Sequence, residues 1–490
     1  MEHKKIFQLV EKMAKTADCE VFAVGGFVRD VLLGRGMDEL KDIDFVVVGS
    51  GLEFAKKFSD SLSEEVGSLV EFPDFDTARY VFKDEQGEVD FEIEFAGARA
   101  ESYRSESRKP IVEAADLEKD LSRRDFTVNA MAVPVKILAG KKKITAELIS
   151  EKIVDPFCGV EDLTRKILRT PLDADITFSD DPLRMLRAAR FAAKLEFRIH
   201  PETIVAMKRN AERLKIISAE RINEELFKLL ATQKPSIGLK ILHDNDVLAE
   251  FLPEVSVLDG VEEVHGYNHK NNLDHTFKVV DNIAVSGGSA LLCFAGLLHD
   301  IGKTDTKKFM PGRGWTFDMH EHLGKKLAAI ICRRLRLSTA QARYVLKLVR
   351  WHQQPIALMD EGVTDSAVRR LIVNLGEDLR DLLILCRSDI TTGNEMKLKK
   401  RLANYDYLSR RIDEVIEADK LRAFQSPFRG DEIMEQCGLR PGPTVGKIKK
   451  ALEEAILDGK IKNDYEEAKK YFLEIKDNYL KNANDWEKIN

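Results

Sequence analysis

The sequence has few of the features that mark secreted or membrane-spanning proteins. Its six cysteines are scattered and form no C-x-x-C pair, which favours a reducing cytoplasm over a disulfide scaffold. The longest apolar run, residues 290–298, is far too short to span a bilayer. Residues 1–20 alternate charged and apolar positions and lack the apolar core of a signal peptide. We therefore predict a cytoplasmic protein with no membrane partner.

Two common phosphate-binding signatures and a strong basic charge are also missing. No G-K-[ST] and no G-x-G-x-x-G follows the glycine pair at 25–26. The net charge of −6 argues against a protein coated everywhere with nucleic acid, although it allows local basic patches. The length of 490 residues predicts two to four domains, and 44% hydrophobic with 33% charged residues indicates an ordered, helix-rich chain.

The stretch 21–51 carries the first chemical pattern. Val21 to Val24 read as a buried strand, Gly25 and Gly26 break it, and a helix follows. The next strand begins with Asp42 and Asp44, whose side chains share one face because strand residues alternate. Backbone N–H groups at such a turn bind phosphate, and paired carboxylates bind Mg²⁺. This arrangement predicts a site for a metal-bound phosphate.

A second strand with strict alternation runs from Asp90 to Phe95. Its apolar residues occupy one face and its three acids the other. Two interpretations stay open: the acidic face is simply solvated, or one acid, for which we favour Glu94 over Glu92, is a third carboxylate beside Asp42 and Asp44.

The segment LSRRDFTVNAMAV, residues 121–133, follows a polar stretch, 105–120, that we expect to be a mobile loop. The segment can be a capped, solvated helix end. The favoured interpretation is that Arg123 and Arg124 neutralise a triphosphate and Asp125 accepts hydrogen bonds from ribose hydroxyls.

The segment 179–197 predicts a helix that Ser or Asp caps, with an apolar stripe of Leu183, Leu186 and Phe191. Asp181 and Arg184 are three residues apart and are expected on one helix face. They form either an ordinary ion pair or a donor–acceptor pair that contacts the edge of a base.

Seven of the ten histidines lie between residues 265 and 352. The strings LDHTF, LLHDIGK and RSDIT place histidine and aspartate on separate predicted helices, which is typical of a divalent metal site. With Lys303 nearby, such a site can activate a metal-bound water against a phosphoester.

The strings GGFVRDVLLG…DIDFVV, RRDFTVNAMA and DDPLR together resemble the class II tRNA nucleotidyltransferase and bacterial poly(A) polymerase family. Asp42 and Asp44 are then the catalytic, Mg²⁺-binding pair. The resemblance and the basic helix face together predict these nucleotide-binding residues: Gly25, Gly26, Arg29, Arg123, Arg124, Asp125, Asn129, Asp181, Arg184, Arg187 and Arg190. Asp180 stands where the family has Glu, and Cys158 stands where its hinge motif has the first of two glycines. Residues 220–226 resemble a further family motif that we expect to be mainly structural.

The string HDIGK resembles the HD phosphohydrolase domain. The resemblance predicts a second divalent metal site, of unspecified metal, with these ligands: His275, His299, Asp300, His320, His352 and Asp389. His322 is the alternative to His320, whereas His265 and His269 are not expected to bind metal.

The resemblance implies an α+β fold with four parts: a nucleotidyltransferase head with a mixed sheet of five strands (1–150), a helical neck and body (151–255), an HD domain (256–400) and a helical tail (401–490). In the tail, GLRPGPTVGKIKK is either a plain loop or a turn whose Lys447, Lys449 and Lys450 meet tRNA phosphates. The last residues are expected to be frayed.

The implied reaction is template-independent addition of C, C and A to tRNA 3′ ends, with tRNA, CTP and ATP as partners and Mg²⁺ at the head. Three alternatives remain: poly(A) polymerase, a CC- or A-adding specialist, and an HD nucleotide phosphohydrolase whose head only binds nucleotide.

Overall fold

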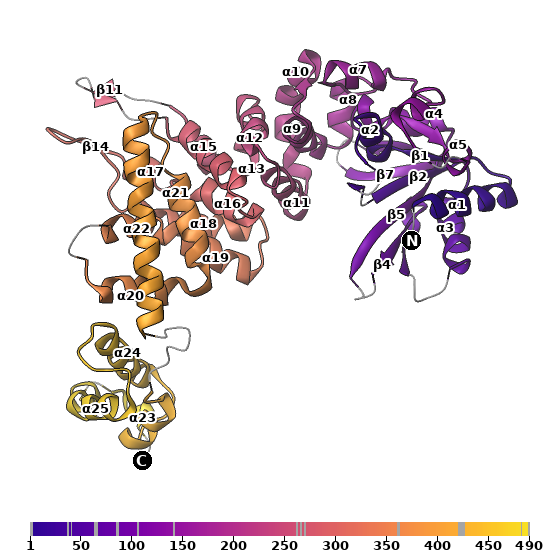
Figure 1. The fold of residues 1–490 in the computed structure, drawn as a ribbon. Helices are drawn as coiled ribbons and strands as arrows, with labels where there is room; N and C mark the ends of the chain where they lie inside the picture. The colour runs from indigo at the N-terminus through magenta and orange to yellow at the C-terminus, as the bar shows by residue number, and fades with distance from the viewer. Residues whose placement is uncertain are drawn as a thin grey trace. The chain divides into compact units, whose positions relative to one another are not determined.

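The computed structural model divides the chain into two compact units, Met1–Gly260 with Ile331–Leu337, and Val261–Ile330 with Ser338–Asn490 (Figure 1). It describes all residues except 1–2, 37–38, 41, 63–66, 85–87, 105–106, 141–142, 261–262, 265–266, 269–270, 360–362, 420–426, 482 and 489–490. The predictions for His265 and His269 fall outside the described residues. None of the helices in the described ranges combines the length and apolarity needed to cross a membrane.

The amino-terminal part of the first unit is built on one mixed sheet in the order β3-β4-β5-β2-β1-β8. Only β2 and β5 run parallel among these neighbours. The strands are β1 (Val21–Val24), β2 (Asp42–Val47), β3 (Gly67–Phe72), β4 (Thr77–Lys83), β5 (Val89–Gly97) and β8 (Ala132–Pro134). The expected α+β class is confirmed, but the sheet has six strands instead of five. The three-residue β8 is too short to show alternation in the sequence.

The two faces of this sheet bury different clusters. Ile43, Phe45 and Val47 of β2 join the main core, where helices α1 (His3–Ala17) and α3 (Gly51–Asp60) pack (Figure 1). Val46 instead belongs to a smaller cluster on the opposite face. Because side chains alternate along a strand, Asp42 and Asp44 lie on the same face as Val46, away from the main core.

The expected mobile loop over 105–120 is wrong for its described residues. Strand β6 (Arg99–Arg104) pairs with β7 (Ser107–Ala114), and helix α4 (Leu117–Ser122) follows. The Asp116 side chain caps α4 by accepting the Lys119 N–H at 2.9 Å. The polar composition of this segment gives no apolar pattern from which either element could be predicted. In addition, β7 forms by pairing with β6, which the sequence alone does not show.

The head ends in short helices, and the rest of the first unit is helical apart from a two-strand ladder. Short helices are α2 (Gly26–Leu32), α5 (Val135–Ala139), α6 (Ala146–Ser150), α7 (Gly159–Arg165) and α8 (Ala174–Asp180). The following helices are α9 (Leu183–Leu195), α10 (Pro201–Asn210), α11 (Ala219–Leu230), α12 (Pro235–Asp244), α13 (Val247–Phe251) and α14 (Pro253–Ser256), with the ladder of β9 (Ile167–Leu168) and β10 (Arg198–Ile199).

The segment at the predicted hinge has a backbone suited to glycine. Cys158 has φ of +59°, in the left-handed region that glycine adopts without strain. Gly159 has no room for a side chain, because a Cβ there would lie 2.3 Å from the Thr127 carbonyl oxygen. Asp155 accepts the Gly159 N–H at 2.7 Å and fixes this turn.

The second unit is helical in its described part except for two short strand pairs. The strands are β11 (Glu263–Val264), β12 (Tyr267–Asn268), β13 (Lys308–Met310) and β14 (Gly314–Thr316). The first helices are α15 (Asn272–Val285), α16 (Ala290–Leu298), α17 (Lys303–Thr306), α18 (His320–Arg334), α19 (Thr339–Trp351), α20 (Asp365–Leu375), α21 (Leu379–Ser388) and α22 (Glu395–Asp419). The tail helices are α23 (Gly430–Cys437), α24 (Pro443–Leu457) and α25 (Tyr465–Leu480).

The expectation that the last residues are frayed is wrong for Glu487. Its carboxylate accepts the Thr444 N–H at 2.8 Å and the Thr444 hydroxyl at 3.0 Å. It also accepts the Asn484 backbone and amide N–H groups, at 3.0 and 2.8 Å. The carboxylate thus occupies the amino end of α24, where an anion is favoured by unpaired N–H groups and the helix dipole. Of the two interpretations of this segment, the one with tRNA phosphates at the turn now has an anion of the chain itself, Glu487, at the amino end of α24.

We expect Glu487→Ala to loosen the start of α24. The loss of four hydrogen bonds to one carboxylate should speed hydrogen exchange at the Thr444 amide and lower the melting midpoint of the tail by roughly 2–5 °C. Hydrogen-exchange mass spectrometry measures this, and Glu474→Ala, an exposed position on α25, is the control. Equal exchange in the two variants would show that the cap contributes nothing.

Candidate active site and candidate metal centre

One hollow of about 790 Å³ in the first unit brings together all the predicted head residues. It is lined by residues from the Gly-Gly turn, from β2, from the 123–129 segment and from α9. The predicted members are Gly25, Gly26, Arg29, Asp42, Asp44, Arg123, Arg124, Asp125, Asn129, Asp181, Arg184, Arg187 and Arg190. Many arginines line it, as suits a polyphosphate.

The carboxylates of Asp42, Asp44 and Glu94 all line this hollow. The parallel register of β2 and β5 sets Asp44 opposite Glu94 and Asp42 opposite Glu92. Burial, then the charge of Glu94, raises the pKa of Asp44 to about 6, against the opposing effect of Arg124. The negative charges of Glu94 and Asp42 both act on Asp44, so a divalent cation bound at these carboxylates would relieve the repulsion. The oxygen donors therefore fit Mg²⁺.

The acidic face of β5 is not merely solvated. Arg79 of β4 pairs with Glu94 at 3.2 Å and with Glu92 at 3.3 Å. Arg79 was not identified as a site residue from the sequence. The available signal was its place in an alternating strand, β4, where it lies opposite Glu94 of β5.

The Gly-Gly turn lets the backbone approach the carboxylates. Gly25 has φ of +67°, and a Cβ there would lie 3.1 Å from Arg124 Nη1 and 3.6 Å from Asp44 Oδ2. Gly26 begins α2, as the break in the sequence predicts. A side chain at position 25 would be strained and would crowd the site.

A buried chain of hydrogen bonds connects α2 with α9. Arg29, only 3% exposed, donates to Asn129 Oδ1 at 2.7 Å, and Asn129 donates to Asp125 Oδ1 at 2.9 Å. Asp125 Oδ2 accepts from Arg187 at 2.8 and 2.6 Å. Burial opposes the charge on Asp125, but Arg187 and Asn129 lower the pKa of this carboxyl to about 2. Asp125 is therefore an anion that orients Arg187.

The arginine pair at 123–124 is held by a residue that the sequence interpretation missed. Asp120 is fully buried and accepts from Arg123 at 2.6 Å and from Arg124 at 3.1 Å. Burial opposes its charge, but the two guanidinium groups lower the pKa of Asp120. Asp120 lies on α4, three and four residues before the two arginines that follow this helix, and that spacing was the available signal.

Asp181 and Arg184 do not form the ion pair that was the alternative interpretation. Asp181 precedes α9, accepts the Leu183 N–H at 3.2 Å and pairs with Arg221 at 2.9 Å. Arg184 donates to the Arg123 carbonyl oxygen at 2.6 Å. The expected Ser or Asp cap of this helix is wrong: positions 179 and 180 belong to α8, and the N-cap of α9 is Pro182, which makes no side-chain capping bond.

Residues 220–226, which we expected to be mainly structural, supply side chains to the lining of the hollow. Glu225, 4% exposed, accepts from Arg190 at 2.7 Å and lies 3.7 Å from Arg187. Both Arg221 and Glu225 line the hollow. Only the packing of α11 against α9 brings them there.

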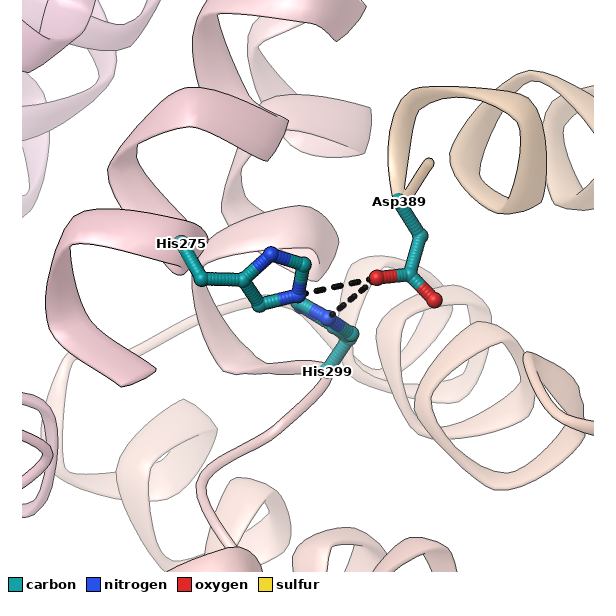
Figure 2. Close-up of side chains that lie close together, drawn as sticks. All are labelled: His275, His299 and Asp389. Carbon is teal, nitrogen blue, oxygen red and sulfur yellow. Dashed lines mark ion pairs between the residues drawn. The ribbon is translucent and has the colours of Figure 1, made fainter. Parts of the chain in front are cut away.

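In the second unit, the predicted HD ligands form two groups. The first has His275 on α15, His299 after α16 and Asp389 after α21 (Figure 2). Asp389 Oδ1 lies 2.9 Å from His275 Nε2 and 3.6 Å from His299 Nε2, and both imidazoles point toward this carboxylate (Figure 2). The second group has Asp300, His320 and His352, with 3.1 Å between the Nε2 atoms of the histidines.

Asp300 lies between the two groups. Its Oδ2 is 3.4 Å from His275 Nε2 and 3.2 Å from His299 Nε2, and its Oδ1 is 3.3 Å from His320 Nε2. Two buried atoms at this point, His299 Nε2 and Asp300 Oδ1, have no hydrogen-bond partner. Buried polar atoms are normally paired, so these donors fit a transition metal ion or two.

The two buried histidines His299 and His352 have pKa values shifted in opposite directions. Burial lowers the pKa of His299, but the carboxylates of Asp300 and Asp389 outweigh it and raise the pKa to about 10. Burial and the charge of His299 lower the pKa of His352 to about 4. His322 is not part of either group: its side chain is 44% exposed and its Nε2 lies 3.7 Å from Glu321. The geometry favours His320 over the alternative ligand.

Three segments of the chain match known families. Residues 21–169 match the poly A polymerase head domain, residues 196–258 match a probable RNA and SrmB-binding site of polymerase A, and residues 272–391 match the HD domain.

Similar proteins come from several bacteria. The chain is 34% identical to the multifunctional CCA protein of Nitrosococcus oceani, over 68% of this chain and 74% of the relative. It is 31% identical to the A-adding tRNA nucleotidyltransferase of Deinococcus radiodurans, over 71% and 76%. The fold is similar to the Bacillus stearothermophilus CCA-adding enzyme in complex with CTP, with a TM-score of 0.61, 22% identity, and 99% and 100% of the two chains covered. The chain therefore belongs to the poly(A) polymerase/CCA-adding family of tRNA nucleotidyltransferases, and it carries an HD domain.

Proposed function

We propose that this enzyme adds C, C and A to tRNA 3′ ends from CTP and ATP. The observation that carries the proposal is that Asp42, Asp44 and Glu94 line one arginine-rich hollow, with Asp44 opposite Glu94 in the parallel register of β2 and β5. Mg²⁺ held by Asp42 and Asp44 would supply activation of the 3′-hydroxyl and stabilisation of the leaving pyrophosphate.

The proposed roles of the other residues follow from their charges and contacts. The Gly25 N–H donates to the Met131 carbonyl oxygen at 3.3 Å, so Gly25 and Gly26 serve the triphosphate by leaving space for it beside the carboxylates. Arg29, Arg123 and Arg124 balance the charge of the triphosphate. Asp181 and Arg184, at the start of α9, offer an acceptor and a guanidinium fork to the base edge. Asp125 and Asn129 bind the nucleotide directly or orient Arg187 and Arg29 toward it.

The architecture that goes with this function is a head of residues 1–150, a neck and body of 151–255, an HD domain of 256–400 and a tRNA-facing tail of 401–490. An embedded HD domain favours CCA addition over poly(A) synthesis, since poly(A) polymerases of this family resemble it in the head and neck only. The A-adding relative from Deinococcus radiodurans keeps the specialist as the competing assignment.

We also propose that the HD centre hydrolyses phosphoesters. Its six predicted ligands come from α15 and α18 and from the ends of α16, α19 and α21, and Lys303 pairs with Asp300 beside them. A divalent metal there would supply an activated water.

One incorporation assay tests the main proposal. The enzyme is incubated with Mg²⁺ and tRNAs that end before CCA, after C and after CC, with labelled CTP and ATP supplied singly and together. We expect the first tRNA to gain all three residues only when both nucleotides are present. Products that stop after CC, incorporation confined to the CC-ending tRNA, or long A tracts would contradict full CCA addition.

A further inference from the structure

Phe191 of α9 lies at the centre of the charged network in the head hollow. Its ring is 5% exposed, and three guanidinium groups lie over it: Arg29 at 5.2 Å, Arg187 at 5.5 Å and Arg190 at 4.2 Å from the centroid. These distances fall within about 6 Å, the range of a cation–π interaction.

Each of these guanidinium groups also has its own carboxylate. Arg29 pairs with Asp30 at 2.8 Å, and Arg187 pairs with Asp125 at 2.6 Å. Arg190 pairs with Glu225 at 2.7 Å. Three cations and three anions therefore balance around one buried aromatic ring. The side chains of Arg29 and Arg190 are 4% and 11% exposed, and such burial strengthens both ion pairing and cation–π attraction.

The arginines come from two parts of the hollow. Arg29 lies on α2, directly after the Gly-Gly turn predicted to bind the triphosphate. Arg187 and Arg190 lie on α9, which begins beside Asp181 and Arg184, predicted to contact the base. The ring is thus a shared contact between the phosphate-binding and the base-contacting ends of the hollow.

We propose that Phe191 is a positioning residue for nucleotide selection, because its ring holds the guanidinium groups of α2 and α9 in one geometry. The inference rests on the proposed nucleotidyl transfer and adds a determinant of CTP and ATP use to it. An aliphatic side chain of similar size would keep the site filled but would offer no π face to the guanidinium groups.

The test compares Phe191→Leu with Phe191→Tyr and with Phe178→Leu. Phe178 is a fully buried phenylalanine of α8, and among the described residues no guanidinium group lies over its ring, so its variant measures the cost of aromatic deletion alone. We expect Phe191→Leu to lower kcat/KM for CTP and ATP about tenfold and to increase incorporation of the wrong nucleotide. Phe191→Tyr should stay within about threefold of wild type, and KM for tRNA should not change in any variant.

Melting temperatures measured alongside separate structure from function. Unchanged nucleotide kinetics in a folded Phe191→Leu variant, with a melting temperature lowered as in Phe178→Leu, would overturn the inference. If Phe191→Leu does not fold, Phe191→Met carries the same expectation. A wild-type enzyme that incorporates neither nucleotide would instead contradict the proposed function itself.

Discussion

Asp44→Asn should abolish nucleotide incorporation and at the same time stabilise the protein in the absence of Mg²⁺. Incorporation should fall at least about 1000-fold, because the amide removes the charge that holds the metal beside the triphosphate. Filter-bound label from CTP and ATP on tRNA measures this loss.

The stability gain follows from the pKa of Asp44, raised to about 6 from 3.8. As the pH rises from 3.8 to 6, the unfolded chain releases this proton before the folded one does, so the folded state loses stability over that interval. Asparagine removes this penalty, so the free energy of unfolding at pH 7.5 should rise by up to about 3 kcal/mol and should not change below pH 4.

Asp42→Asn is the matched control for this experiment. Asp42 is exposed on the same strand face, so the substitution should impair incorporation with little change in stability. Added Mg²⁺ should stabilise wild type and not Asp44→Asn. Wild-type rates of incorporation by Asp44→Asn would remove the basis of the proposed mechanism.

Asp300→Asn should remove metal from the HD centre without affecting incorporation. The carboxylate faces both histidine groups, so its loss takes a charged ligand from each. We expect metal content after Mn²⁺ or Ni²⁺ loading to fall by at least half, and phosphoester hydrolysis to fall about 100-fold or more. Elemental analysis and hydrolysis of p-nitrophenyl phosphate measure the two effects.

His322→Ala is the matched control here. His322 lies on the same helix as His320 but points away from both groups, with a side chain that is 44% exposed. It should keep full metal content and activity. Equal metal content in Asp300→Asn and wild type would show that the proposed ligand set is wrong, and a wild type that binds metal but hydrolyses no ester would leave the HD domain as a binding module.

Local sequence patterns were sufficient for the elements that carry the chemistry. The strand Val21–Val24, the glycine break and the paired aspartates of β2 follow from alternation and from backbone freedom at glycine. The apolar run of α16 and its terminal His299 and Asp300 were predicted in the same way. The spacing of side chains along a strand or helix is set by the backbone geometry of neighbouring residues, so the sequence alone shows which of them share a face.

What the sequence by itself determined is therefore many of the residues that line the hollow, though not Arg79, Arg221 or Glu225, and the strand face or helix end that carries them. Only the tertiary structure decided how they pair: Asp125 with Arg187, 62 residues away, Glu225 with Arg190, and Glu487 with the start of α24. The strand pair β6–β7 belongs to the same class. Such contacts depend on which elements pack side by side. In the sequence, each of these polar residues has many possible partners of opposite charge, and only the packing of the elements selects the partner that it contacts.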